Sequence, residues 1–265
     1  MTNRLRSSLL SANVAPRDKL APKETLAAAQ YTASHGENHT ALFAPLHYEP
    51  NYAYPLLVWL HGSGDDESQL KRIMPLVSMR NYVAVAPRAP HQPAGDSEKV
   101  AGGWSQTGER WTIGEQFVFD AIEAAQSRYH ISARRVFIAG FDAGGTMAFR
   151  LAMDYPQRFA GALSLCGRFP AGQTPLKRIA LARQVPIFLA CGRDSRRYAS
   201  AEVCEHLKLF HSAGMNVSLR QYPCGQEMVP AMLADMDRWI MEQISASSAA
   251  KSEDACVEDF DLFGR

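Results

Sequence analysis

An aspartate stands where the spacing of small residues predicts a reactive side chain. The run 137–145 holds Gly140, Asp142 and Gly144 in the pattern Gly-x-Asp-x-Gly. Apolar residues precede it, and a helix-forming sequence follows it as far as Pro156. A sharp turn from a strand into a helix needs small residues, because the backbone passes close to its neighbours and one residue is held under strain. The pattern is typical of a nucleophile elbow, and it makes Asp142 the candidate nucleophile.

The elements that would position this residue alternate between strand and helix. Continuous apolar runs predict strands buried on both faces of a sheet, and amphipathic runs predict helices between them. The alternation indicates right-handed crossovers in a mostly parallel central sheet with helices on both faces. The strands are expected at about 39–48, 55–60, 82–86, 136–139, 159–166, 186–190 and 217–222, and the helices at about 67–79, 113–129, 146–155, 199–212 and 228–244.

Composition excludes several function classes. The chain of 265 residues has a formal net charge of +1, which gives no reason to expect binding to nucleic acid or to an acidic membrane surface. No apolar run is long enough for a membrane span, and no secretory signal is recognisable. The five cysteines lack paired metal-ligand spacing, so they predict buried thiols in a reducing cytoplasm, without a metal or another cofactor.

Three segments are expected. Residues 1–38 are polar and predict a loosely ordered lead-in, and residues 39–244 form one domain. Residues 245–265 are acidic and poor in apolar side chains, which predicts a disordered tail that could carry a short motif for a protein partner.

Several loops follow the predicted strands, and together they resemble the phospholipase/carboxylesterase family of the α/β-hydrolase superfamily over residues 39–244. The matching motifs are Leu60-His61-Gly62-Ser63-Gly64-Asp65-Asp66, Ala86-Pro87-Arg88-Ala89-Pro90, Gly103-Trp104, Arg134 to Gly145, Tyr155 to Gly161, Cys191-Gly192-Arg193-Asp194 and Tyr222 to Met228. The resemblance implies a single-domain α/β-hydrolase fold. Too few residues separate 166 from 186 to form a cap domain.

The resemblance also implies a triad in the chain order serine, aspartate, histidine. Its three positions hold Asp142, Asp194 and Gln226 here. Glutamine has no nitrogen that titrates near neutral pH, so it cannot act as the general base. The Gln226 amide is expected to donate one hydrogen bond to each carboxylate, and the two nearby charges should raise the pKa of one of them.

The oxyanion hole implied by the resemblance uses the backbone amides of Ser63 and Ala143, and the Asp142 carboxylate could fold back onto them. Around it we expect a pocket walled by His61, Gly62, His91 and Trp104. The remaining histidines His130, His206 and His211 are expected on outer helices, away from the site.

Three functions stay open. The replaced triad favours a non-catalytic binding or regulatory protein with a small ester or acyl ligand. A weak esterase that relies on the oxyanion hole is the alternative. An aspartate-nucleophile hydrolase fits Asp142, but it lacks both a histidine to activate water and a helical cap.

Overall fold

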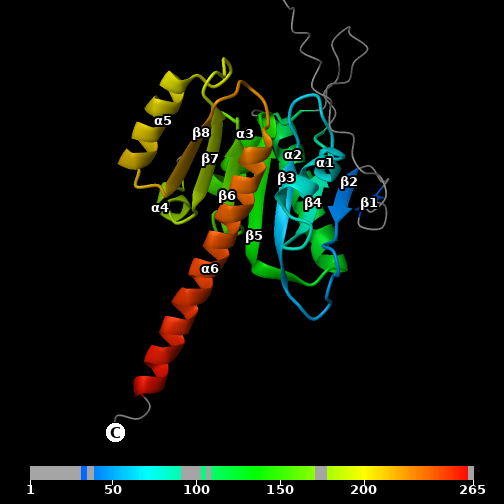
Figure 1. Ribbon diagram of the computed structural model, residues 1–265, viewed down its shortest axis with the longest axis vertical. Coiled ribbons are helices and arrows are strands. Elements are labelled where there is room, and N and C mark those ends of the chain that lie inside the picture. Colours follow the sequence, from blue (N-terminus) through cyan, green and yellow to red (C-terminus); the bar gives the residue numbers. More distant parts are fainter. Residues whose placement is uncertain (1–30, 35–38, 91–102, 106–108, 171–177, 262–265) are drawn as a thin grey trace, which may run out of the picture.

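A computed structural model describes residues 31–34, 39–90, 103–105, 109–170 and 178–261 (Figure 1). Its strands are β1 (Tyr31–Ser34), β2 (Thr40–Phe43), β3 (Tyr54–Leu60), β4 (Val83–Pro87), β5 (Ile131–Phe141), β6 (Gly161–Leu165), β7 (Ile187–Gly192) and β8 (Val217–Tyr222). Its helices are α1 (Gln69–Val77), α2 (Glu109–Arg128), α3 (Ala143–Asp154), α4 (Ile179–Ala182), α5 (Ser200–Ser212) and α6 (Pro230–Asp261).

The strands form one eight-stranded sheet in the order β1-β2-β4-β3-β5-β6-β7-β8. From β4 to β8 every neighbouring pair is parallel, whereas β2 pairs antiparallel with both β1 and β4. The parallel strands therefore place their carboxyl ends at one edge, where sheets of this kind bind ligands. The predicted α/β fold with one mostly parallel sheet is confirmed.

The central strand β3 shows why continuous apolar runs became strands. All seven of its residues are buried. Leu56, Val58 and Leu60 join the apolar cluster on one face of the sheet, whereas Leu57 and Trp59 join the cluster on the other. A strand covered on both faces needs apolar side chains in both directions, because either face would otherwise bury a polar group.

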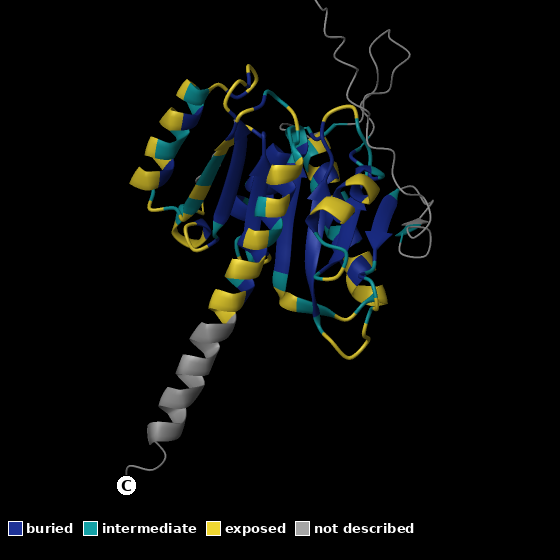
Figure 2. Cartoon of the chain, viewed as in Figure 1, coloured by how far each residue is buried: buried dark blue, intermediate teal, exposed yellow. Residues whose placement is uncertain are grey.

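Helices cover both faces of the sheet (Figure 2). On one face, Val118 of α2, Met147 of α3 and Phe210 of α5 pack into a single core with the strands. On the other face, Ile73 of α1 and Trp239 of α6 do the same. The site lies where α3 begins, so both cores fix the position of that helix through the strands beside it.

The segment boundaries expected from the sequence need two corrections. Strand β1 lies inside the expected lead-in and pairs residue by residue with β2, and its Tyr31 ring packs 5.2 Å from the Phe43 ring. Helix α6 crosses the expected boundary at residue 245 and continues to Asp261, where a disordered tail was predicted. A low content of apolar side chains does not by itself end a helix, as long as neither glycine nor proline interrupts it.

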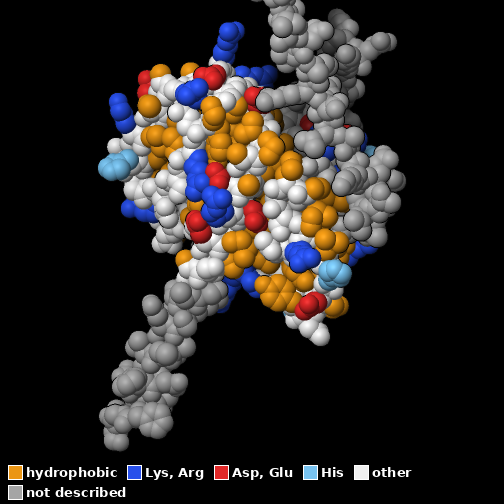
Figure 3. Space-filling model, in the orientation of Figure 1, with side chains coloured by type: hydrophobic (Ala, Val, Ile, Leu, Met, Phe, Trp, Pro, Cys, Tyr) orange, Lys and Arg blue, Asp and Glu red, His pale blue; other side chains and the backbone are white. Residues whose placement is uncertain are grey.

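Acidic and basic side chains intermix on the face shown in Figure 3. Asp235 of α6 pairs with both Arg220 of β8 and Arg238, at 2.8 Å each. Among the described helices, none combines the length and the apolar character needed to cross a bilayer.

Candidate active site

Asp142 occupies a strained turn between β5 and α3. Its backbone dihedrals are φ 51° and ψ −118°, a conformation that costs a residue with a side chain about 1–3 kcal/mol. The surrounding structure holds the turn, since the Asp142 amide donates to the Leu165 carbonyl at 2.9 Å. A Cβ atom on Gly144 would lie 2.1 Å from the Leu60 carbonyl oxygen, so only glycine lets α3 approach β3 this closely. The sharp turn predicted from the small residues is present.

The carboxylate of Asp142 is fully engaged. The Arg197 guanidinium lies 2.9 Å from Oδ2, and the Gln226 side-chain amide donates to Oδ1 at 3.0 Å. Burial opposes ionisation, since the side chain is only 15% exposed, but hydrogen bonds from Ser63, Arg197 and Gln226 and the charge of Arg197 hold the Asp142 pKa below its usual value. The expected rise of a carboxylate pKa is therefore wrong for Asp142, because the charge beside it is positive.

Gln226 is fixed by three hydrogen bonds. Its amide nitrogen donates to Asp142 and, at 2.8 Å, to the Cys166 carbonyl, while its Oε1 accepts the Ser195 hydroxyl at 2.6 Å. Ser195 is itself buried, and its oxygen accepts the backbone N–H of Tyr198 at 3.1 Å. The amide has no donor left for a second carboxylate or for a reacting group.

The structure corrects the expected role of Asp194. Its side chain is 63% exposed and lies 3.5 Å from Arg193, whereas Ser195, the next residue, contacts Gln226. Asp194 does reach the same sheet edge, where its amide donates to the Cys224 carbonyl at 2.9 Å. The chain of contacts therefore runs Asp142, Gln226, Ser195, and it contains neither Asp194 nor a histidine.

The two amides expected in the oxyanion hole remain available. Among the backbone hydrogen bonds that the described residues make in turns, loops and helix caps, none is donated by the amide of Ser63 or of Ala143. The Asp142 carboxylate does not cap α3 either. The Asp142 carboxylate, which could have folded back onto these amides, does not do so, because Arg197 and Gln226 hold it elsewhere. Both amides lie at the edge of the sheet, and that of Ala143 opens α3, an arrangement that favours a negatively charged oxygen.

His61 supports the Ser63 loop from behind. It is fully buried, and its Nε2 accepts the Ala89 N–H at 2.9 Å, so Nδ1 carries the proton and donates to the Gly62 carbonyl at 2.9 Å. Burial lowers the His61 pKa, which keeps the ring neutral. The indole of Trp104 donates to the His61 carbonyl at 3.0 Å. His61, Gly62 and Trp104 thus build the loop and do not wall the pocket, and His91 lies outside the described residues.

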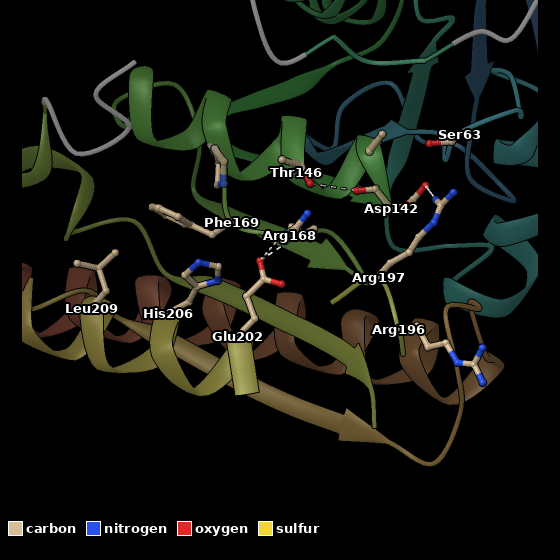
Figure 4. A pocket seen from close by; sticks show the side chains of 12 residues that line it. Ser63, Asp142, Thr146, Arg168, Phe169, Arg196, Arg197, Glu202, His206 and Leu209 are labelled. Atoms are coloured by element: carbon tan, nitrogen blue, oxygen red, sulfur yellow. Dashed lines mark hydrogen bonds and ion pairs between the residues drawn. The ribbon is translucent and has the colours of Figure 1, made fainter. Parts of the chain in front are cut away.

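The pocket at this site has a volume of about 860 Å³ and lies between α3 and α5 (Figure 4). Ser63, Asp142 and Arg197 form its polar end, and Phe169 and Leu209 lie at its other end. Between them, Arg168 pairs with Glu202 at 2.6 Å. This volume suits a small organic ligand.

His206 lines the same pocket, which corrects its expected place away from the site. It lies on α5, with Nδ1 2.9 Å from the Tyr198 hydroxyl and its ring 5.2 Å from Phe169, and burial lowers its pKa. Ser195 and Arg197 were also missed by the sequence. Polar residues just after a predicted strand were the only available signal.

No metal centre is suggested by the described residues, among which no cluster of three or more histidine, cysteine or acidic side chains could hold an ion.

Three known proteins are similar to this chain in sequence or in fold. The “Putative esterase NocK” of Nocardia uniformis subsp. tsuyamanensis is 28% identical over 123 residues. The match spans 44% of this chain and 34% of that protein's length. SOBER1 of Arabidopsis thaliana superposes with a TM-score of 0.61 at 22% identity, covering 72% of this chain and all of SOBER1. The Bacillus cereus carboxylesterase gives 0.61 at 16% identity, with coverages of 79% and 96%.

These two structures share the fold with this chain. The family model described as Phospholipase/Carboxylesterase matches residues 49–244, which include every strand from β3 to β8 and each of the three triad positions. That region makes up most of the chain, and the chain belongs to the phospholipase/carboxylesterase family.

Proposed function

We propose that this member of the family is a non-catalytic binding protein, whose site holds a small acyl or ester-derived ligand without hydrolysing it. One observation carries the proposal: Gln226 stands where the resemblance places the histidine, and all of its amide hydrogen-bonding groups are used by Asp142, Cys166 and Ser195. A glutamine locked in this way can neither accept a proton from a nucleophile nor return one to a leaving group.

The state of Asp142 supports the same proposal. Its carboxylate is ionised, paired with Arg197 and bonded by Gln226, and it is a poor nucleophile towards an ordinary ester. Ester formation at this side chain, as in an aspartate-nucleophile hydrolase, would also require activated water for release. Gln226 cannot activate that water, and in the described residues only the four-residue helix α4 lies between β6 and β7 where a cap would be.

The free amides of Ser63 and Ala143 favour one second candidate, a weak esterase. Oxyanion stabilisation and binding alone can accelerate hydrolysis by about 1,000-fold over water. Ser63 would be the displaced nucleophile, because its hydroxyl faces the Asp142 carboxylate.

The proposal includes a cytoplasmic location, which the buried free thiols Cys166, Cys191 and Cys224 support. It also retains the C-terminal segment from residue 245 as the region for a protein partner.

A fluorophosphonate probe tests the proposal, together with turnover of short p-nitrophenyl esters. The purified protein should show no labelling at the elbow and no turnover above a Ser63→Ala control of equal folded content. Labelling at Ser63, with turnover that the Ser63→Ala variant loses, would establish the weak esterase instead.

A further inference from the structure

The pocket has a charged end and an apolar end (Figure 4). Arg196 and Arg197, on the loop after β7, line it together with Asp142 and Ser63. The opposite end is formed by Phe169, on the loop after β6, and Leu209 of α5. An occupant that matches both ends must itself be amphipathic.

Positive charge exceeds negative charge in the lining. The lining contains three arginines and two carboxylates, and both carboxylates are already used: Asp142 pairs with Arg197 at 2.9 Å and Glu202 pairs with Arg168 at 2.6 Å. The exposed Arg196 side chain points away from Asp142 in Figure 4, and a ligand would meet its guanidinium after a turn of that side chain. Arg196 is left over, since no carboxylate in the described part of the chain lies within ion-pair distance of it.

Further donors stand at the same end. The Arg197 guanidinium spends one nitrogen on Asp142 and keeps its remaining N–H groups, and the Ser63 and Ala143 amides are unused by the backbone of the described residues. Acceptors there are fewer, because both oxygens of Asp142 already receive hydrogen bonds. An ester offers only weak, neutral acceptors to this surplus, whereas a carboxylate offers two charged oxygens.

The apolar end is held rigidly. The Phe169 ring packs against Phe149, Phe210 and His206, with centroids 5.4, 5.2 and 5.2 Å away. Leu209 is 38% exposed, which leaves part of its side chain open to a ligand. A fixed aromatic ring and an open aliphatic side chain suit an aryl or alkyl body.

We propose that the pocket binds small amphipathic carboxylic acids, with the carboxylate at Arg196 and Arg197 and the apolar body against Phe169 and Leu209. This inference rests on the proposed function and deepens it: the ligand is the free acid and not its ester. The site of a family of ester hydrolases would thereby retain the acid that hydrolysis releases.

Calorimetric titration of the full chain with three ligands that share one apolar group tests the preference for the acid over the ester. The ligands are 3-phenylpropionate, its methyl ester and 3-phenylpropylamine, at pH 7 and low ionic strength. The acid should bind at least about tenfold more tightly than the ester, and the amine should bind most weakly. Added salt should reduce the difference, because the arginines are exposed to solvent.

Variants locate the carboxylate. Arg196→Gln should weaken binding of the acid about tenfold and leave binding of the ester unchanged. Arg193→Gln is the matched control, because Arg193 lies on the same loop, pairs with Asp194 and does not line the pocket. Leu209→Ser should weaken acid and ester equally.

Equal affinity for acid and ester, tighter binding of the amine, or an Arg196→Gln variant that binds like the Arg193→Gln control would each overturn this inference. None of these results would touch the proposed absence of catalysis. Hydrolysis of the methyl ester in the same titration would refute the proposed function, whatever the order of affinities.

Discussion

The Ser195 hydroxyl donates a 2.6 Å hydrogen bond to Gln226, whereas the neighbouring Asp194 carboxylate lies at the surface against Arg193. Ser195 therefore holds the place from which an acid would orient a histidine at position 226. A hydroxyl satisfies a neutral amide well, but it offers no charge to stabilise an imidazolium.

This contact determines which substitutions would be needed to build a serine–histidine–acid triad at this site. We expect the double change Asp142→Ser with Gln226→His to remain nearly inactive, because no carboxylate would face the new histidine. Adding Ser195→Asp should raise the rate of p-nitrophenyl acetate hydrolysis at least about 100-fold over the double variant, which is the usual scale of general-base assistance. Steady-state kinetics would measure this, with thermal unfolding as the check on folding.

The control for the repair is the double variant carrying Asp194→Asn. If Asp194 were the acid after all, the double variant would already be active and this additional change would abolish its activity. If the variant that combines Asp142→Ser, Gln226→His and Ser195→Asp folds but has no activity, the oxyanion loop at Ser63 is not competent.

Acid should weaken the protein through Asp142. The pKa of this group is lower in the folded chain than its ordinary value of 3.8, so its ionised form stabilises the fold above that pH and the contribution is lost as pH falls through the lower, folded value. We expect Asp142→Asn to lose about 1–2 kcal/mol at pH 7, at or below the low end of the range for hydrogen bonds to a charged group, because Arg197 is largely exposed and solvent screens the pair. The wild type should approach the variant below pH 3.8.

Urea unfolding at pH 7 and at pH 3 would measure both effects. Asp194→Asn is the control, because that side chain is exposed, and it should follow the wild-type pH dependence. An Asp142→Asn variant as sensitive to acid as the wild type would contradict the pairing with Arg197.

The strain at Asp142 can be separated from its contacts by two substitutions. Both Asp142→Ala and Asp142→Gly remove the carboxylate, but only glycine relieves a side chain held at φ 51°. We expect the glycine variant to be more stable than the alanine variant by about 1 kcal/mol, against the usual preference for alanine. Equal stability, or a more stable alanine variant in chemical denaturation, would show that the turn costs nothing.

A close contact between two loops sets the position of Gln226. A Cβ atom on Gly192 would lie 2.0 Å from the Gly225 carbonyl oxygen, while one on Gly225 would meet nothing within 4 Å. Gly192→Ala should therefore cost about 2 kcal/mol or more and should shift the Gln226 side-chain amide signals in an NMR spectrum, because it pushes apart the loops that carry Ser195 and Gln226.

Gly225→Ala is the matched control and should stay within about 0.5 kcal/mol of the wild type with unshifted signals. Equal stability of the Gly192→Ala and Gly225→Ala variants would contradict the close approach of Gly192 to the Gly225 carbonyl oxygen.

The sequence predicted most elements because parallel strands buried on both faces are continuous apolar runs. Residues 55–60, for example, lie within β3. It missed β1, whose four residues carry no such run and whose contacts come from pairing with β2 and from the packing of Tyr31 against Phe43. Helix α6 was predicted to end at residue 244, because the sequence from residue 245 is poor in apolar side chains.

Within the site, the small residues around Asp142 predicted the turn, and the strand ends brought Gln226 to it. The contact of Ser195 with Gln226 was not readable, because the sequence alone does not tell which of two neighbouring polar residues in the loop after β7 points inward. The role of Arg197 could not be foreseen, because an exposed arginine in a loop has no pattern until its partner is placed beside it.

The glycine at position 144 has a consequence for how this protein could change. Two backbone features hold the turn: the close approach of Gly144 to the Leu60 carbonyl oxygen and the hydrogen bond from the residue 142 amide to Leu165. Neither uses the side chain of residue 142, so the backbone of the site does not depend on which side chain stands there. A binding protein and an esterase would then be separated by three side chains on one unchanged scaffold. If the chain is the binding protein proposed above, these three substitutions could convert it into an esterase without refolding.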